Sequence, residues 1–213
     1  MIDPVVIIGI AGFGRETADV ADATRTPIAG FVDDFPSQPH LDLVQARGVP
    51  FLGTVDEWLS RTPGGASYVI GIGNGRIREH LADKLDRAGH VARTMVHPSA
   101  TMGFGVDIGA GSVICAGVCL SNSIRLGRHT TLNPNSTIGH DTVLDDFVSI
   151  NPTANVSGAV HVGARTLIGA GATVLQNLTV GADVTVGAVA LVTKNVPDGV
   201  TVVGIPGRWK DPA

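Results

Sequence analysis

Cysteine and aromatic residues are scarce in this sequence. Cysteine occurs 2 times in 213 residues, as Cys115 and Cys119, and aromatic residues make up 4% of the chain. Two thiols are too few for a disulfide framework or for a zinc site with four thiolate ligands, and no metal requirement is expected. We therefore interpret both cysteines as small core or turn residues.

Clusters of positive charge and long apolar runs are also missing. The 15 Lys and Arg residues are scattered among 19 Asp and Glu, which gives a formal net charge of -4. Without a basic patch, nucleic acid and anionic membranes are not expected as partners. The apolar run from Val5 to Ile10 is about a third of the roughly 20 residues that a bilayer span requires, and no basic segment precedes it. The sequence therefore predicts a cytoplasmic protein.

What the sequence does contain is a repeat of six residues. Every sixth residue from Ile108 to Val192 is Ile, Leu or Val. These types make up roughly a quarter of the chain, so the probability of such a run by chance is on the order of 10⁻⁹ to 10⁻⁸. A period of six fits neither a helix nor the alternation of an ordinary strand, which excludes an amphipathic helical bundle for residues 108–197.

Glycine often follows the repeated aliphatic residue, at positions 109, 127, 139, 163, 169, 181 and 187. We interpret it as a turn residue that needs an unusual φ angle, because glycine adopts such angles at little cost. Short strands that each point one aliphatic side chain inward, separated by turns, stack as the coils of a parallel β-helix. The repeat thus predicts a β-helix in the second half of the chain.

The first hundred residues show a different pattern, in which buried strands alternate with helices. Strands are predicted over residues 5–8, up to Phe31, over 68–72 and over 92–96. The capping pair Thr54 and Glu57 predicts a short helix that ends near Leu59, and aliphatic residues at four-residue spacing predict another that ends before Gly89. This alternation indicates a small parallel α/β unit of the Rossmann-like kind.

Three loops of this unit follow strands and are expected to meet at one edge of its sheet. The first is the Gly-rich turn from Gly9 to Gly14, whose backbone amides are suited to a phosphate. Two adjacent aspartates follow the second strand and would read a ribose or a base edge. The alternative is a tight turn without ligand and a solvated acidic loop. The candidate substrate-binding residues are Ala11, Gly12, Phe13, Asp33, Asp34 and Gly73.

Histidine is the side chain best suited to act as a base near neutral pH, and the chain has 7. His140 is followed directly by Asp141 within the repeats, and a neighbouring carboxylate favours a protonated imidazole. This pair is the candidate catalytic group, and the alternative is a structural histidine. The remaining histidines are expected at the surface, in the linker or at other repeat positions: His40, His80, His90, His97, His129 and His161.

The hexads resemble the left-handed parallel β-helix of the hexapeptide-repeat acyltransferases, in which three hexads form one coil; the left hand is taken from this resemblance. On that basis the repeats form about five coils. The whole chain also resembles the family of sialic-acid O-acetyltransferases and bacterial nucleotide-amino-sugar N-acetyltransferases. The segments that carry this resemblance are the Gly-rich turn, Phe-Val-Asp-Asp, Ile-Gly-Asn, the junction Val96–Ala100 and the segment Val203–Gly207. The resemblance implies an α/β, Rossmann-like sugar- or nucleotide-binding domain over residues 1–97 and a left-handed β-helix acyltransferase domain over 98–213.

The same resemblance implies the reaction and its residues. An acetyl group passes directly from acetyl-CoA to an amino group of a nucleotide-activated amino sugar, with His140 as general base and Asp141 tuning it. The backbone N–H of Gly158 receives the oxyanion. Relatives carry a second histidine where this chain has Ser149, and some carry histidine where it has Phe13. A homotrimer with shared active sites is implied. The acetyl-CoA contacts implied are Ser149, Gly158, Ala170 and Ala188.

Other functions stay open at this stage. An O-acetyltransferase of sialic acid or another free sugar would use the same residues, and a non-catalytic nucleotide-binding scaffold would keep the repeat without the His140–Asp141 pair. A zinc lyase on this type of β-helix needs three converging imidazoles, whereas His129, His140 and His161 fall at different positions of the coil. A dinucleotide-dependent oxidoreductase would need a second α/β half for the nicotinamide.

Overall fold

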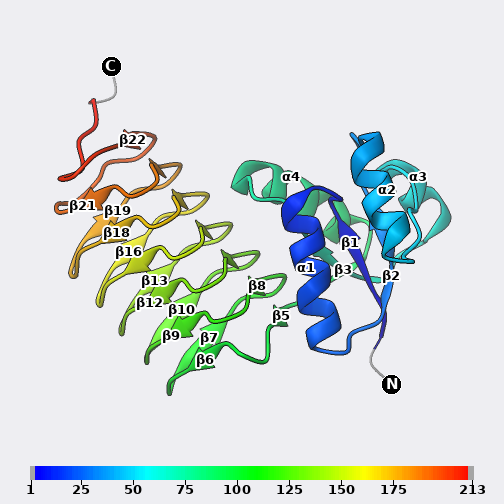
Figure 1. Cartoon of the computed structure of the whole chain (residues 1–213), viewed down its shortest axis with the longest axis horizontal. Helices are drawn as coiled ribbons and strands as arrows, with labels where there is room; N and C mark the ends of the chain where they lie inside the picture. Colours follow the sequence, from blue (N-terminus) through cyan, green and yellow to red (C-terminus); the bar gives the residue numbers. More distant parts are fainter. Residues whose placement is uncertain (1–2, 211–213) are drawn as a thin grey trace.

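The computed structural model describes residues 3–210 and shows an α/β unit beside a stack of coils (Figure 1). The α/β unit, called the N-terminal domain below, has a parallel sheet in the order β2-β1-β3-β4. This confirms the predicted α/β unit. Its elements are β1 Val5–Ile8, α1 Gly12–Ala23, β2 Ile28–Val32, α2 Gln38–Ala46, α3 Val55–Arg61, β3 Ser67–Ile70, α4 Gly75–Arg87 and β4 Val91–Ala92.

Helices cover both faces of this sheet because successive strand residues point to opposite sides. Val5 and Ile7 pack against residues of α1 and α2, and Val6 and Ile8 pack against residues of α3 and α4. The capping box predicted at the start of α3 is present. The carboxyl ends of the parallel strands therefore form one edge of the sheet, between the two layers of helices.

The coils form a β-helix whose walls are three parallel sheets, named sheets I, II and III in the order in which the chain enters them. Aliphatic side chains from all three sheets fill the interior, which confirms the predicted β-helix. Sheet I contains β5 Met95–Val96, β8 Val113–Ile114, β11 Thr131–Leu132, β14 Ser149–Ile150, β17 Leu167–Ile168, β20 Thr185–Val186 and β22 Thr201–Val202. Sheet II contains β6 Thr101–Met102, β9 Cys119–Leu120, β12 Thr137–Ile138, β15 Asn155–Val156, β18 Thr173–Val174 and β21 Leu191–Val192. Sheet III contains β7 Val106–Ile108, β10 Ile124–Leu126, β13 Val143–Leu144, β16 His161–Val162 and β19 Thr179–Val180.

The strand predicted over residues 92–96 is in fact two strands in different sheets. The Arg93 amide still bonds to Tyr68 of the N-terminal sheet, whereas the Met95 amide bonds to Ser112 of the next coil. The β-helix therefore starts at β5, earlier than the repeat suggested, and it has about six coils instead of five. An extended segment looks the same in sequence whichever neighbour it pairs with. The domain division after residue 97 stays a prediction.

The glycines that follow the repeated aliphatic residue do not serve as turn residues with positive φ. Positive φ occurs two residues later in the hexad instead, mostly at residues other than glycine such as Asp141 (58°) and Phe147 (63°). A Cβ on Gly109 would lie 2.5 Å from the Arg128 amide nitrogen of the next coil, and one on Gly163 would lie 2.5 Å from that of Ala182. Close stacking of the coils, not backbone angle, therefore explains these glycines.

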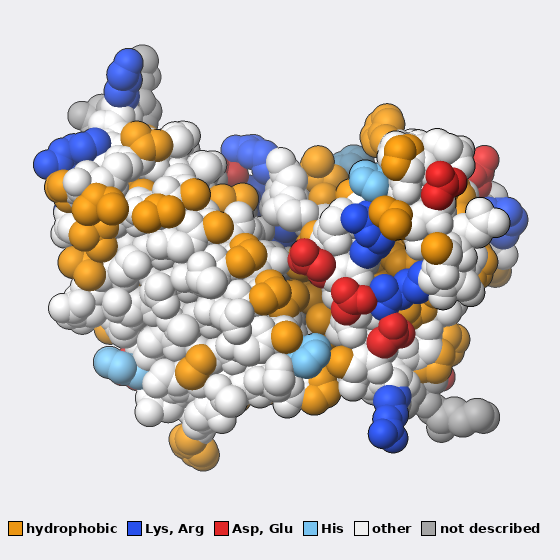
Figure 2. Space-filling model, viewed as in Figure 1, with side chains coloured by type: hydrophobic (Ala, Val, Ile, Leu, Met, Phe, Trp, Pro, Cys, Tyr) orange, Lys and Arg blue, Asp and Glu red, His pale blue; other side chains and the backbone are white. Residues whose placement is uncertain are grey.

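The N-terminal domain covers the outer face of sheet I in the early coils. The outward side chains of Met95, Val113, Thr131 and Ser149 are all at most 3% exposed. Corresponding residues of sheets II and III, such as Arg125, Thr137, Asn155 and His161, face solvent. In Figure 2, charged side chains gather over the N-terminal domain, whereas the β-helix face in view is mostly uncharged. The corner between sheets II and III thus stays open in one chain.

Arg78 of α4 joins the two units through the centre of their interface. Its side chain is 1% exposed, and burial lowers its pKa to about 10, so it stays charged at neutral pH. Nη1 donates to the Ile72 and Gly73 carbonyls at 2.9 Å each. Across the interface, Nε donates to the His129 carbonyl at 3.0 Å and Nη2 to the Phe147 carbonyl at 2.6 Å. One guanidinium thus connects the β3–α4 loop to two successive coils.

Two histidines that were not expected to be buried lie inside the molecule. His90, expected at the surface, is 5% exposed and stacks on Trp58 at 4.5 Å, because the chain turns inward after α4. His129 is 1% exposed and lies between Tyr68 and Phe147, with ring centroids 6.0 Å and 5.5 Å away. Among the described residues, neither ring nitrogen of His129 has a hydrogen-bond partner. Burial, with a contribution from Arg128, lowers the pKa of His129 to about 4.

Burial of His129 predicts that the protein loses stability at mildly acidic pH. An unfolded histidine binds a proton near pH 6.5, whereas His129 in the folded protein stays neutral down to about pH 4. Stability from this residue is thus complete above pH 6.5 and falls by up to about 3 kcal/mol as the pH drops through this range. Urea unfolding at pH 7 and pH 5 measures the fall in the free energy of unfolding between these pH values. We expect this fall to be smaller in His129→Phe by the share that His129 contributes. An unchanged pH dependence in the variant would contradict the assignment.

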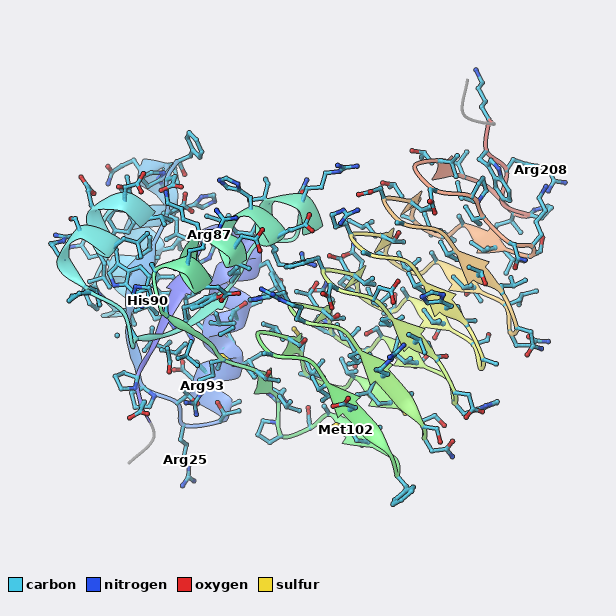
Figure 3. All side chains as sticks on the ribbon, turned by 180° about the vertical axis from the view of Figure 1, so that it is seen from behind. Arg25, Arg87, His90, Arg93, Met102 and Arg208 are labelled. Carbon is cyan, nitrogen blue, oxygen red and sulfur yellow. The ribbon has the colours of Figure 1, made fainter. Side chains whose placement is uncertain are left out.

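The last coil ends in a turn that folds back on itself. After β22, Val203 and Arg208 exchange two backbone hydrogen bonds of 2.9 Å, as an isolated antiparallel bridge. The Lys194 ammonium then lies 4.5 Å from the centroid of the Trp209 ring, a cation–π contact. Met102 of the first coil and Arg208 lie at opposite ends of the β-helix in Figure 3.

Candidate functional site

His140 and Asp141 occupy the turn between β12 of sheet II and β13 of sheet III, called the catalytic corner below. The His140 Nδ1 and the Asp141 Oδ2 lie 2.7 Å apart, with the two side chains 60% and 61% exposed. A carboxylate accepts hydrogen bonds, so the ring donates from Nδ1 and keeps Nε2 as an open acceptor. The structure thus brings the two predicted residues together, and the hydrogen bond to Asp141 fixes the orientation of the imidazole ring.

Gly158 lies directly against the imidazole of His140, one coil later in the same corner. A Cβ on Gly158 would be 2.5 Å from the Nε2 of His140. In the next corner of the coil, the equivalent amides of Arg128 and Ala182 donate to aspartate side chains at 2.8 Å. Among the described residues, the Gly158 amide donates to no such partner. The imidazole of His140 therefore lies next to Gly158, whose backbone N–H has no partner of this kind within residues 3–210.

Ala170 and Ala188 stack on each other but lie at a different corner from His140. The Val189 amide donates to the Ala170 carbonyl at 2.9 Å, and both alanines are exposed. They follow strands of sheet I and precede strands of sheet II, so the width of sheet II separates them from the catalytic corner. Within one chain these residues do not form one site with His140.

Ser149 is not available for the contact with acetyl-CoA that was expected of its side chain. It is 2% exposed and lies under the N-terminal domain. Its hydroxyl accepts from Nη2 of Arg78 at 3.0 Å and donates to the Gly73 carbonyl at 3.0 Å. This correction has a plain cause, because position 149 is in sheet I, whose outer face is covered in this coil.

The Gly-rich turn leads into the N-terminus of α1, as predicted. Ala11 is the N-cap residue without a side-chain cap, and both Ala11 and Gly12 are exposed. At α4, by contrast, the side chain of Asn74 accepts from two amides of the first turn. The first amides of α1 are therefore the ones open to an anion. Phe13 is half-buried and packs against the core between α1 and the sheet, so its ring does not face a ligand at this turn.

A hollow of about 400 Å³ lies at the carboxyl ends of the strands and includes Asp33 and Asp34. Asp33 accepts from the amides of Ile10 and Phe35 at 2.9 Å and 2.8 Å, and Asp34 accepts from that of Val55 at 2.8 Å. The two carboxylates thus hold three loops at the rim. Gly73 belongs to the adjoining loop but does not line the hollow. Two further lining residues, Phe35 and His80, were missed in the sequence because each looks like an ordinary exposed residue.

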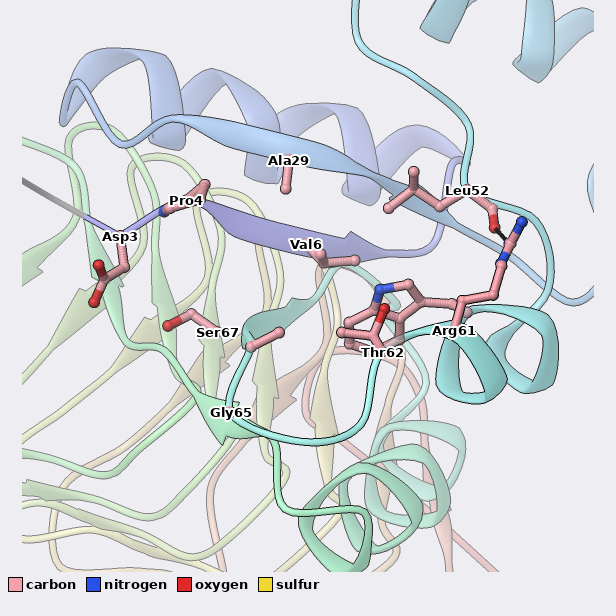
Figure 4. A pocket seen from close by; sticks show the side chains of 11 residues that line it. Asp3, Pro4, Val6, Ala29, Leu52, Arg61, Thr62, Gly65 and Ser67 are labelled. Carbon is pink, nitrogen blue, oxygen red and sulfur yellow. Dashed lines mark hydrogen bonds between the residues drawn. The ribbon is translucent and has the colours of Figure 1, made fainter.

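A second hollow, of about 620 Å³, lies at the opposite edge of the same sheet (Figure 4). Pro4 and Ser67, at the amino ends of their strands, line it together with Leu52, Trp58 and Arg61. None of the predicted site residues lines this second hollow. Parallel α/β sheets bind ligands at the carboxyl ends of their strands, so the smaller hollow is the better candidate.

Residues 3–210 carry neither a cluster of potential metal ligands nor a helix suited to a bilayer. In this range there is no group of three or more His, Cys, Asp or Glu side chains that could hold a metal ion. Across the same residues, every helix is too short or too polar to span a bilayer.

Comparison with known proteins identifies relatives of both units. The family model described as the PglD N-terminal domain matches residues 4–85. GDP-perosamine N-acetyltransferase of Escherichia coli O157:H7 is 30% identical over 150 residues, which cover 67% of this chain and 65% of that protein. The chain thus matches slightly less than two thirds of the length of this relative.

Solved structures match over the whole chain. One is a perosamine N-acetyltransferase from Caulobacter crescentus with a histidine replaced by asparagine, in complex with CoA and GDP-perosamine. It is 30% identical, with a TM-score of 0.91 over 100% of this chain and 99% of that chain. Another is the acetyltransferase domain of PglB from Neisseria gonorrhoeae FA1090 in complex with acetyl coenzyme A. It is 32% identical, with a TM-score of 0.89 over 99% of this chain and 100% of that chain.

Proposed function

Since the chain belongs to the hexapeptide-repeat family of nucleotide-amino-sugar N-acetyltransferases, we propose that it transfers the acetyl group of acetyl-CoA to an amino group of a nucleotide-linked amino sugar. The observation that carries the proposal is the catalytic corner, where Asp141 bonds to Nδ1 of His140 and Gly158 lies against the same imidazole ring. A non-catalytic scaffold has no need of this arrangement. We propose a cytoplasmic location for this reaction, because its proposed co-substrate is acetyl-CoA.

The residues of the corner account for each step of a direct transfer. Nε2 of His140 removes a proton from the attacking amine, whose nitrogen forms a bond to the thioester carbon. The Gly158 N–H donates to the negatively charged oxygen of the tetrahedral intermediate. As the carbon–sulfur bond breaks, the proton on His140 passes to the CoA thiolate. Asp141 holds the ring in one tautomer throughout and stabilises its charged form.

The acceptor is proposed to lie with its nucleotide at the N-terminal domain. The open amides of Ala11 and Gly12 suit a phosphate, and the hollow beside Asp33 and Asp34 suits a ribose or base. Gly73 adjoins this hollow from the β3–α4 loop. Two of the relatives above are named for, or bind, GDP-perosamine, which makes it the first acceptor to test.

The acetyl-CoA site is proposed to lie between two chains of a homotrimer. Ala170 and Ala188 are separated from His140 by the width of sheet II, so one acetyl-CoA reaches both sets of residues more readily across a subunit boundary. The exposed faces of sheets II and III leave room for such contacts. Light scattering should then give three times the chain mass of 21.9 kDa. A stable monomer would rule out the shared site.

The experiment that tests the function is release of CoA thiol from acetyl-CoA with a panel of acceptors. GDP-perosamine, a nucleotide sugar whose amine is replaced by hydroxyl, and free sialic acid distinguish N-acetylation from O-acetylation and from action on a free sugar. We expect turnover with the amino sugar alone. Turnover with sialic acid but not with GDP-perosamine would replace the proposal by O-acetylation, and no turnover with any nucleotide amino sugar would overturn it.

Adding one methyl group at Gly158 should disable the site without unfolding the protein. In Gly158→Ala the new Cβ would lie 2.5 Å from Nε2 of His140, so the ring must move off its position. We expect turnover to fall by roughly 10²-fold, because the base and the oxyanion donor are both displaced. Gly187→Ala is the matched control, since the nearest atom there is 3.2 Å away. Equal loss in both variants would show a general effect on the coils.

A further inference from the structure

The catalytic corner continues along the whole β-helix as a column of outward residues. Backbone hydrogen bonds connect each coil to the next at this corner. The amide of Ser123 donates to the carbonyl of Phe104 at 2.9 Å, and that of Asp141 to Asn122 at 3.1 Å. The amide of Ala159 donates to the carbonyl of His140 at 2.7 Å, and that of Asn177 to Gly158 at 3.1 Å. Each acceptor residue therefore sits one coil above the previous one, at a spacing of roughly 4.8 Å. Phe104 and Asn122 lie two coils and one coil before His140, and Gly158 and Gln176 lie one and two coils after it.

This order gives the site two distinguishable sides. Gly158, which binds the thioester oxygen in the proposed mechanism, lies on the later-coil side of His140. The donor therefore occupies that side and extends toward Gln176. An amine that attacks the thioester carbon while its proton goes to His140 has to approach from the other side. That side is formed by Asn122 and Phe104.

Both residues on this earlier-coil side are free to contact a ligand. Phe104 is 92% exposed, which is unusual for a large aromatic side chain. It stands between Gly103 and Gly105, so no neighbouring side chain in the sequence covers its ring. Asn122 is exposed, so its side-chain amide is open to solvent. An apolar ring beside an amide is a common pair of contacts for a sugar, whose C–H face is apolar and whose edge carries hydroxyls.

We propose that Asn122 and Phe104 form the acceptor side of the catalytic corner, where Asn122 bonds to a hydroxyl of the amino sugar and Phe104 packs against its apolar face. The inference rests on the proposed function, since it assumes that a nucleotide amino sugar is the acceptor. It assigns these two residues to acceptor specificity, and it assigns Gln176 on the opposite side to acetyl-CoA.

The test is a comparison of two variants placed symmetrically about His140. With GDP-perosamine as the acceptor probe, Phe104→Ala should raise the acceptor KM roughly tenfold and leave the KM for acetyl-CoA within twofold. Gln176→Ala should show the reverse split. Phe104→Tyr, which keeps the ring, should restore the acceptor KM, and this rescue separates a ligand contact from a loss of folding.

Each other result overturns the inference. If Phe104→Ala raises the KM for acetyl-CoA, the two sides are reversed, and if neither KM changes, Phe104 does not contact the acceptor. If light scattering shows that Phe104→Ala changes the oligomeric mass, the ring holds a second copy of the chain instead. In all three cases acetyl transfer by the unchanged protein would leave the proposed function intact. If the unchanged protein transfers no acetyl group to GDP-perosamine or another nucleotide amino sugar, both proposals fail.

Discussion

His140→Asn is expected to lower turnover by 10²-fold or more while the protein keeps its fold and its affinity for acetyl-CoA. General base catalysis by a positioned side chain contributes roughly 10² to 10⁴ in rate, and asparagine offers no nitrogen that accepts a proton. The side chain is 60% exposed, and its hydrogen-bonded partner Asp141 is 61% exposed, so its loss creates no cavity. Turnover in the thiol-release assay and acetyl-CoA affinity by calorimetry measure the two effects separately.

His161 provides a matched control for this variant. Its Nε2 lies 3.0 Å from Asp145 Oδ2, and its side chain is 49% exposed, so it is a second histidine–aspartate pair on the same β-helix. It projects from sheet III and not from the catalytic corner. Among the described residues, no glycine lies against its ring in the way that Gly158 lies against that of His140. His161→Asn should keep turnover within twofold. A loss equal to that of His140→Asn would mean that exposed histidines matter for another reason, and the assignment of the base would be wrong.

Arg78→Met is expected to cost about 4 kcal/mol of folding stability, the largest effect on stability that we expect for a single substitution. Methionine fills much of the volume but donates no hydrogen bond. The buried acceptors of Arg78 would then lose this donor. They are the carbonyls of Ile72, Gly73, His129 and Phe147 and the hydroxyl of Ser149. Urea unfolding followed by fluorescence measures the change.

The same variant should also separate the unfolding of the two units. The two units also share apolar contacts, at Met95, Val113 and Phe147, and partly exposed ion pairs such as Arg128 with Asp86 cross the interface. Among the described residues, however, Arg78 is the charged side chain that is buried there, so its loss should weaken the coupling most. Arg76→Met is the control, because Arg76 lies on the same helix but is 71% exposed, and its ion pair with Asp183 is expected to contribute at most about 0.5 kcal/mol. Since both arginines reach the β-helix, an equal loss of stability in the two variants would mean that burial of the Arg78 guanidinium is not the cause.

The importance of Arg78 could not be predicted from the sequence, whereas the catalytic corner could. The coil geometry follows from a local period of six, so the turn with His140 and Asp141 is fixed by residues a few positions away. The partners of Arg78 lie 51 to 71 residues further along the chain in the β-helix. By its position in the sequence of α4, Arg78 resembles the other charged residues of a solvent-exposed helix face. Packing between units that are distant in sequence leaves no periodic signal.

The same limit explains the error at Ser149 and the misinterpretation of the repeat glycines. Ser149 has the sequence position of a site residue, yet the N-terminal domain covers the sheet to which it belongs. The glycines were interpreted from their own backbone angles, whereas their true constraint is the next coil, 15 to 19 residues further along. In both cases the deciding neighbour comes from elsewhere in the chain. Gly158 is the exception, because the family resemblance pointed to it.

The folded-back turn after β22 has a consequence for the behaviour of the protein at high concentration. A stack of parallel coils ends in unpaired backbone groups, which form a template for another chain and, in principle, for a growing fibre. Here the bridge between Val203 and Arg208 turns the final strand onto itself, and Trp209 lies over Lys194 at that end. The chain therefore terminates its own ladder, and removal of residues after Val202 should convert a discrete assembly into one that grows end to end.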